Sequence, residues 1–170
     1  GNSDDSGDTY VAWCWDMGGS NATNNDGSIT STVRANTTYG QSIVSYDYGS
    51  GAQTIGHGLD SAPEMILMKN RDYGNNWDVF HTSVGATKRL KLNDDAVPQT
   101  VSGVWNDTAP TSEVFSTNDW LNAAGNKVIA YCFHSVTGYS KFDSYSGNGT
   151  TTNAITTGFE PAFVMLKRTD

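Results

Sequence analysis

Two short tryptophan-containing clusters carry the residue types from which a binding site for a polar molecule can be built. Both lie in stretches dominated by turn-forming residues, away from the clearest strand patterns, so their side chains are candidates for the surface. An aromatic ring beside amide and carboxylate groups can stack on a sugar while accepting hydrogen bonds from its hydroxyls. The candidate sugar platform consists of Trp105, Asn106, Asp107, Asp119 and Trp120. The competing interpretation is that each tryptophan covers one end of a hydrophobic core.

Recognisable catalytic motifs are missing from the sequence. It contains no Gly-X-Ser-X-Gly elbow of a serine hydrolase and no glycine pattern that ends like a phosphate-binding loop. A glycosidase needs two carboxylates at a fixed separation, and the many aspartates offer too many pairs for one to be singled out. We therefore predict that the protein is not an enzyme. A glycan-degrading enzyme is the least favoured alternative.

Metal sites receive little support from residue spacing. The three histidines, His57, His81 and His134, show none of the short His and Cys spacings of zinc sites. Two turns, at residues 24–28 and 93–95, supply Asn and Asp oxygens that suit Ca²⁺, but neither continues into a twelve-residue loop that ends in Glu. Solvated turns are the simpler interpretation. We predict no cofactor, with Ca²⁺ at these Asp-rich turns as the alternative.

The charge of the chain excludes some partners. The formal net charge is −8 and the pI about 4.6, so the basic surface that nucleic acid requires is not expected. The longest apolar runs are far shorter than a membrane-spanning helix, and we predict no membrane insertion. An acidic surface rich in Asn, Asp and Thr suits an extracellular particle.

The elements that must position these residues are predicted to be strands. Strong helix formers are scarce, whereas turn formers and strand formers are abundant. Short strands at regular spacing predict an all-β, β-sandwich or jelly-roll-like fold of many short antiparallel strands over residues 1–170, with one helical turn near residues 119–123. The expected strands are 9–15, 29–35, 41–48, 52–57, 64–69, 76–82, 87–92, 99–104, 112–117, 127–133, 139–145, 152–156 and 162–168.

The chain contains an internal repeat. YVAWCW at residues 10–15 is matched by VIAYCF at 128–133, with an offset of 118 residues. APEMILMK at 62–69 is matched by EPAFVMLK at 160–167, with an offset of 98 residues. The shorter offset implies an insertion of about 20 residues in the first copy, at 20–39. A repeat of about 98–118 residues therefore has a complete copy at about 10–137 and a partial one at 127–170.

The two cysteines occupy the same position in the repeated strand. Cys14 and Cys132 both lie in strands that are apolar on both faces, which is typical of central strands. The second copy keeps the cysteine and replaces each tryptophan by another aromatic residue, as packing permits and a chemical site seldom does. We therefore predict that both cysteines are buried, reduced and not bonded to each other.

With the repeat laid out, the chain resembles a known β-rich module. The strings TYVAWCW, TIGHGLDSAPEMILMKNR, WNDTAPTSEVFS and GYSKFDSYSGNG carry the resemblance, which extends over about residues 6–170. The module recurs in tail and tail-fibre proteins of bacteriophages, especially marine and cyanobacterial ones. The resemblance implies a structural or adhesive role in a virion or extracellular fibre, self-assembly as a homo-oligomer or fibre, and contact with cell-surface glycans. A lectin with a defined sugar site is the alternative function.

Overall fold

A computed structural model gives the fold, and it describes residues 6–10, 12, 14–119 and 124–170. Within these residues the regular elements are short β-strands, one 3-10 helix, η1 (Thr37–Tyr39), and the single 3-10 residue Asp119. The strands are β1 (Ala22–Asn24), β2 (Ser31–Asn36), β3 (Gln41–Asp47), β4 (Gln53–Gly56), β5 (Met65–Asn70), β6 (Asp78–His81), β7 (Lys88–Lys91), β8 (Gln99–Thr100), β9 (Val114–Thr117) and β10 (Lys127–Phe133).

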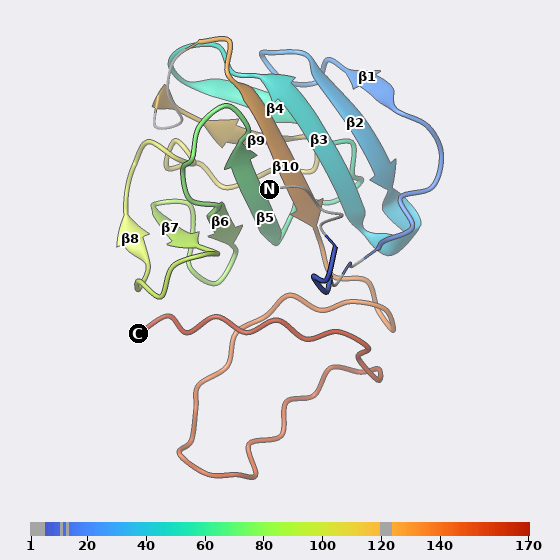
Figure 1. Ribbon diagram of the computed structural model, residues 1–170, viewed down its shortest axis with the longest axis vertical. Coiled ribbons are helices and arrows are strands. Elements are labelled where there is room, and N and C mark those ends of the chain that lie inside the picture. The colour runs from blue at the N-terminus through green and yellow to red at the C-terminus, as the bar shows by residue number, and fades with distance from the viewer. Residues whose placement is uncertain (1–5, 11, 13, 120–123) are drawn as a thin grey trace.

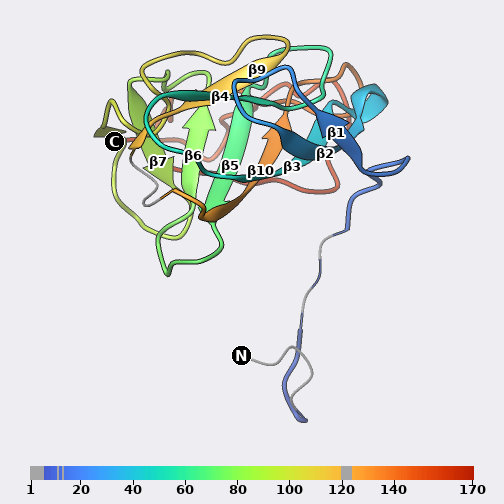
Figure 2. The ribbon, with the colours of Figure 1, turned by 90° about the horizontal axis from the view of Figure 1, so that it is seen from above.

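The strands form two sheets that pack face to face. The larger sheet has the order β1-β2-β3-β10-β5-β6-β7-β8, and its paired strands are antiparallel. The smaller sheet consists of β4 and β9, which lie over one face of the larger sheet (Figures 1 and 2). The predicted all-β sandwich is therefore confirmed. Both edge strands of the large sheet, β1 and β8, are very short, which limits edge-to-edge pairing.

Strand β10 is the centre of the large sheet, as its double-faced apolar pattern predicts. It pairs with β3 on one side and β5 on the other, so Cys132 faces Ser42 and Ile66. Side chains alternate between faces, and Val128, Ala130 and Cys132 point toward the small sheet and are fully buried. The small size of Ala130 and Cys132 leaves room for the second layer to approach.

The main core fills the space between the two sheets. Ile55 of β4 and Phe115 of β9 are fully buried against side chains of the large sheet, and Phe115 meets the ring of Tyr46 edge to face at 6.1 Å. Burying one such side chain contributes roughly 1.5–3 kcal/mol. A smaller cluster of Met65, Val79 and Leu90 lies apart from this core.

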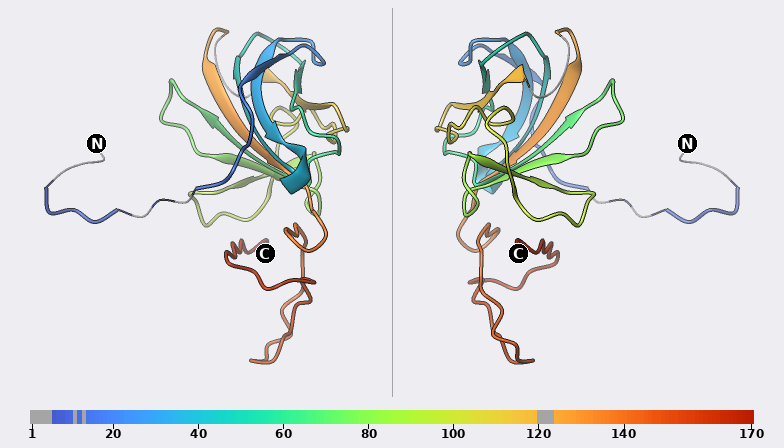
Figure 3. Two further views of the ribbon diagram at one scale, coloured as in Figure 1. Left: turned by 90° about the vertical axis from the view of Figure 1, so that its right-hand side faces the viewer. Right: turned by 90° about the vertical axis from the view of Figure 1, so that its left-hand side faces the viewer.

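Four predicted strands are wrong. Residues 139–145, 152–156 and 162–168 form no strand, and neither do the described residues of 9–15. An apolar alternating segment becomes a strand only where a neighbouring strand satisfies its backbone groups, and these segments have no ladder partner in the described part of the chain. The two copies of the sequence repeat thus do not share one folded structure. In Figure 3 both terminal segments project from the sandwich.

The prediction for the cysteines is half right. Cys132 is fully buried, and burial raises the pKa of its thiol to about 12. Cys14 is exposed, which contradicts the predicted burial, because the segment around it is not part of a sheet. Both thiols are free, so the prediction that they are not bonded to each other is confirmed.

Candidate functional site

Trp105, the centre of the predicted sugar platform, is a core residue. Only 1% of it is exposed, and its ring meets Phe80 edge to face at 5.8 Å. A ring in this position cannot stack on a sugar, so the predicted platform role of Trp105 is wrong and the competing interpretation as core cover is correct. The other predicted platform ring, Trp120, lies outside the described residues, as does most of the helical turn expected near 119–123.

The residues after Trp105 form a tight polar turn. Asn106 and Asp107 have φ angles of 50° and 47°, and among the described residues they alone combine a positive φ with a side chain. Asn and Asp tolerate this left-handed region better than other side-chain-bearing residues. Thr108 N–H donates to the Trp105 carbonyl at 3.0 Å and closes the turn. The buried Trp105 thereby anchors a turn that presents Asp107 to solvent.

A second polar segment, at the end of β9, lies beside this turn. Asn118 donates from Nδ2 to Asn106 Oδ1 at 2.9 Å, and Asn118 N–H donates to the Gly103 carbonyl at 2.9 Å. Asp119 N–H donates to Asn118 Oδ1 at 2.8 Å. The structure therefore brings together polar residues from two separate loops. They are Asn106 and Asp107 from the first loop and Asn118 and Asp119 from the second.

Asp119 is held in place from the other side by the loop after β3. Its Oδ1 accepts hydrogen bonds from Gly51 N–H at 2.6 Å and from the Tyr48 hydroxyl at 3.2 Å. Burial and the hydrogen bond to Asp119 raise the pKa of Tyr48 to about 12, so the phenol stays a neutral donor at physiological pH. Both of these hydrogen bonds are made to Oδ1 of Asp119.

These loops border an open hollow of about 880 Å³, which we call the loop hollow. Most of its surface is apolar, and its polar groups are hydroxyls, one amide and two carboxylates; the lining residues are Thr87, Thr100, Val101, Ser102, Gly103, Asp107, Asn118 and Asp119. No lysine or arginine is among them. Such a surface accepts hydrogen bonds from hydroxyl groups and disfavours anions.

Sequence reasoning found part of this lining and missed the rest. Asp107 and Asp119 were expected to contribute to a binding surface, and the structure places both at the hollow. Thr87, Thr100 and Ser102 were not singled out, because hydroxyl residues are abundant throughout the chain. The pairing of β7 with β8 brings them to this place, and no local signal in the sequence announces that pairing.

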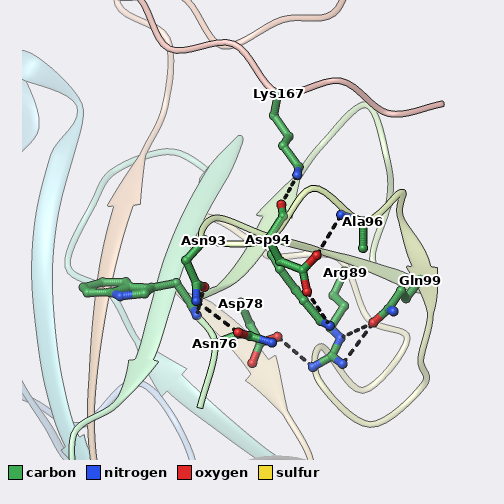
Figure 4. Close-up of polar contacts among 10 residues, drawn as sticks. Asn76, Asp78, Arg89, Asn93, Asp94, Ala96, Gln99 and Lys167 are labelled. Atoms are coloured by element: carbon green, nitrogen blue, oxygen red, sulfur yellow. Dashed lines mark hydrogen bonds and ion pairs between the residues drawn. The ribbon is translucent and has the colours of Figure 1, made fainter. Parts of the chain in front are cut away.

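The two Asp-rich turns use their oxygens within the protein. In the first turn, Asn24 and Asp26 hydrogen-bond to each other twice. In the second, Asp94 accepts from Lys91 Nζ at 3.0 Å and from Ala96 N–H at 2.8 Å, and its carbonyl accepts from Lys167 (Figure 4). Among the described residues no group of three or more His, Cys, Asp or Glu side chains is arranged to hold a metal ion.

A buried ion pair beside the second turn ties the outer strands together. Arg89 of β7 donates to Asp78 Oδ1 of β6 at 2.9 Å, and the same guanidinium reaches Gln99 of β8 at 3.0 Å (Figure 4). Burial raises the pKa of Asp78, and the charge of Arg89 opposes that shift. With both charges satisfied inside the sheet, we assign this pair a structural role.

The described residues contain no helix with the length and apolar character that a membrane span requires.

The comparisons give a family and no further relative. A family model described as a domain of unknown function (DUF7483) matches residues 1–170. No curated protein and no solved structure matches the chain. The family description names no activity, so the expected relationship to phage tail proteins stays a prediction.

Proposed function

The chain belongs to the family described as a domain of unknown function (DUF7483), and we propose that it is a non-enzymatic structural and adhesive module of a phage tail appendage or a similar extracellular fibre. In this proposal the carboxylates, amide and hydroxyls of the loop hollow contact cell-surface glycans. The observation that carries it is the convergence of Asp107, Asn118 and Asp119, from two loops, on one open surface. Polar groups held by a rigid β-scaffold are a common basis of recognition.

The open shape of the hollow favours weak contact with a polysaccharide over tight capture of one sugar. Because Trp105 is buried, the described part of the hollow offers no aromatic ring to stack on a sugar ring. Hydrogen bonds that compete with water give modest affinity on their own. Many copies on one fibre would raise the overall strength by multivalency. This argument favours an adhesive module over the alternative, a lectin with a defined sugar site.

The charge of the hollow selects among glycans. Asp107 and Asp119 bring two carboxylates, and none of the described lining residues is cationic. The hydroxyls of a neutral glycan donate hydrogen bonds to these carboxylates, whereas the carboxylates of an acidic glycan are repelled. We therefore expect binding of neutral glycans and exclusion of sialylated or uronic-acid-rich ones.

Self-association is part of the same proposal. Four consecutive apolar residues near the C-terminal end, Phe163 to Leu166, are 53%, 63%, 42% and 69% exposed. A contiguous exposed apolar stretch is typical of a surface that becomes covered by another protein. We expect the chain to form a stable oligomer or filament in sizing chromatography with light scattering. A monomer that persists at high protein concentration would argue against the fibre role.

A glycan array with defined variants tests the adhesive role. Asp107→Gly and Ser102→Ala remove acceptors from the exposed side of the hollow, and glycine tolerates the positive φ of residue 107 without strain. We expect each variant to lose neutral-glycan signal by roughly fivefold, equivalent to about one hydrogen bond. Asp95→Ala, an exposed aspartate in the turn at 93–95, is the matched control.

Three results would count against this assignment. Signal that is equal in all three variants would place the contact elsewhere on the molecule. A preference for acidic glycans would contradict the charge argument. Degradation of the glycan during the assay would show that the protein is an enzyme.

A further inference from the structure

The two terminal segments of the chain have the sequences of strands that are neighbours in the folded sheet. Residues 10–15 match β10, and residues 160–167 match the segment that contains β5. Residues 138–142, which follow β10, match the segment that begins β3, with Gly138-Tyr139-Ser140 in place of Gly40-Gln41-Ser42. In the large sheet β10 lies between β3 and β5. A strand with the sequence of β10 therefore fits between strands with the sequences of β3 and β5.

One side-chain contact already matches the register of that arrangement. In the large sheet Phe133 of β10 is the Cα partner of Met65 of β5. The equivalent residues in the terminal segments are Trp15 and Phe163. Their rings meet edge to face, with centroids 6.4 Å apart and planes at 85°. Two segments separated by most of the chain thus touch at the pair of positions that the repeat predicts.

The third segment lies next to the same point. Gln41 is the other Cα partner of Phe133, and its equivalent is Tyr139. The ring of Tyr139 stacks on Tyr39 at 4.5 Å, and Gln41, two residues after Tyr39, donates from Nε2 to the Asp16 carbonyl at 2.9 Å. The residue after Trp15 is therefore close to Tyr139. The three segments thus approach one another near Trp15, although their described residues form no strand.

We propose that the terminal segments have a second, paired conformation, in which the segment of Ala12, Cys14 and Trp15 lies between residues 139–145 and 162–168 of the same chain, as β10 lies between β3 and β5. In this register Cys14 is opposite Val164 and Ala12 is opposite Leu166. Pairing would satisfy the backbone groups of all three segments. The partner comes from the same chain because Trp15 and Phe163 already hold the two segments together, which raises their effective concentration. The inference does not depend on the proposed adhesive function.

The large sheet also predicts which residue pair can be cross-linked. Arg71 N–H donates to the Lys127 carbonyl at 2.8 Å, which marks Arg71 and Lys127 as a hydrogen-bonded pair. Such pairs alternate with non-hydrogen-bonded pairs along an antiparallel ladder, so Ile66 and Cys132 form a non-hydrogen-bonded pair. Cα atoms at those positions are about 4.5 Å apart, within the range of a disulfide. Their equivalents are Val164 and Cys14.

The test uses the Val164→Cys variant of the full chain, in which native Cys14 supplies the second thiol. The side chain of Val164 is 63% exposed, so the substitution does not disturb the core. We expect oxidised glutathione to produce an intramolecular disulfide, detected by intact mass and by a non-reducing gel, at a rate that does not change with protein concentration. Buried Cys132 remains reduced.

Two variants serve as matched controls. Met165→Cys moves the thiol by one residue to the opposite face of the strand, and Ile155→Cys places it at a comparably exposed position in the same C-terminal segment. Each should form its disulfide with Cys14 at least about tenfold more slowly than Val164→Cys. Hydrogen exchange on the unmodified chain gives a second measurement, in which the amides of Ala12 and Cys14 should be protected.

Each contrary result overturns a stated part of the proposal. Equal rates for the three variants would eliminate the register. A product that is mainly a covalent dimer, and that increases with protein concentration, would show that residues 10–15 bind a second copy and not their own chain. Exchange at Ala12 and Cys14 as fast as in an unfolded peptide would rule out the strand.

Discussion

Replacing Trp105 by alanine should destabilise the whole fold, because the indole is part of the main core. The ring is 1% exposed, borders the fully buried Val104 and contacts Phe80. Removing a buried tryptophan costs about 3–5 kcal/mol. For a protein of this size each kcal/mol lowers the Tm by about 2–4 °C, which predicts a decrease of about 6–20 °C. The control is Trp105→Phe, which keeps most of the volume.

The Trp105→Phe control should lose less stability than Trp105→Ala. Trp105 Nε1 is buried and makes no hydrogen bond with a described residue. Phenylalanine removes this unsatisfied donor while leaving a cavity smaller than the one that alanine leaves, so we expect a loss of about 1–2 kcal/mol. Urea unfolding followed by circular dichroism measures both variants. An unchanged midpoint for Trp105→Ala, or equal losses for the two variants, would refute the volume argument.

Three further predictions concern thiol reactivity, pH and packing. Exposed Cys14 should react with a thiol reagent in the native protein, whereas buried Cys132, whose pKa burial raises to about 12, should react only after unfolding; mass spectrometry of the labelled protein counts the modified thiols. Burial lowers the pKa of His57, whose Nδ1 accepts from Leu59 N–H, so the folded state favours the neutral ring. The unfolded state takes up the proton below about pH 6.5, so the free energy of unfolding should fall between about pH 7.5 and 5.5, and by less in His57→Gln. Gly27→Ala would place its Cβ 2.2 Å from the Thr54 carbonyl oxygen and should cost about 1–3 kcal/mol in urea unfolding, whereas Gly147→Ala, with open space around it, should be neutral.

Local patterns predicted every strand of the sandwich except β1, together with four strands that do not form, but they did not predict which segments pair. The expected strand at 127–133 coincides with β10, and the expected strands at 41–48 and 64–69 coincide with β3 and β5 to within a residue at each end. YVAWCW has the same alternation as VIAYCF, yet only VIAYCF lies between two strands in the described fold. The alternation of side chains along a segment shows that the segment could join a sheet. Whether it does so depends on adjacent strands that can pair with it.

The sequence predicted the polar residues of the candidate site but not the burial of its tryptophan. Asn106, Asp107 and Asp119 are turn-favouring residues, and the structure places them together at one surface. The burial of Trp105 depends on how the segment after β8 folds back over Phe80, a tertiary contact with no local signature. Burial of an aromatic residue is therefore a weaker inference from sequence than the presence of a polar turn.

The central place of β10 has a consequence for how the protein is made. It is the last strand of the sandwich to leave the ribosome, yet it joins β1–β3 to β5–β8. Until residue 133 has emerged, the two halves of the sheet have no common strand, and β3 and β5 each keep an unpaired edge. At about 5–20 residues per second, the nascent chain spends several seconds in this state. We therefore expect the unfinished chain to aggregate more readily than the chain in which β10 has joined the sheet.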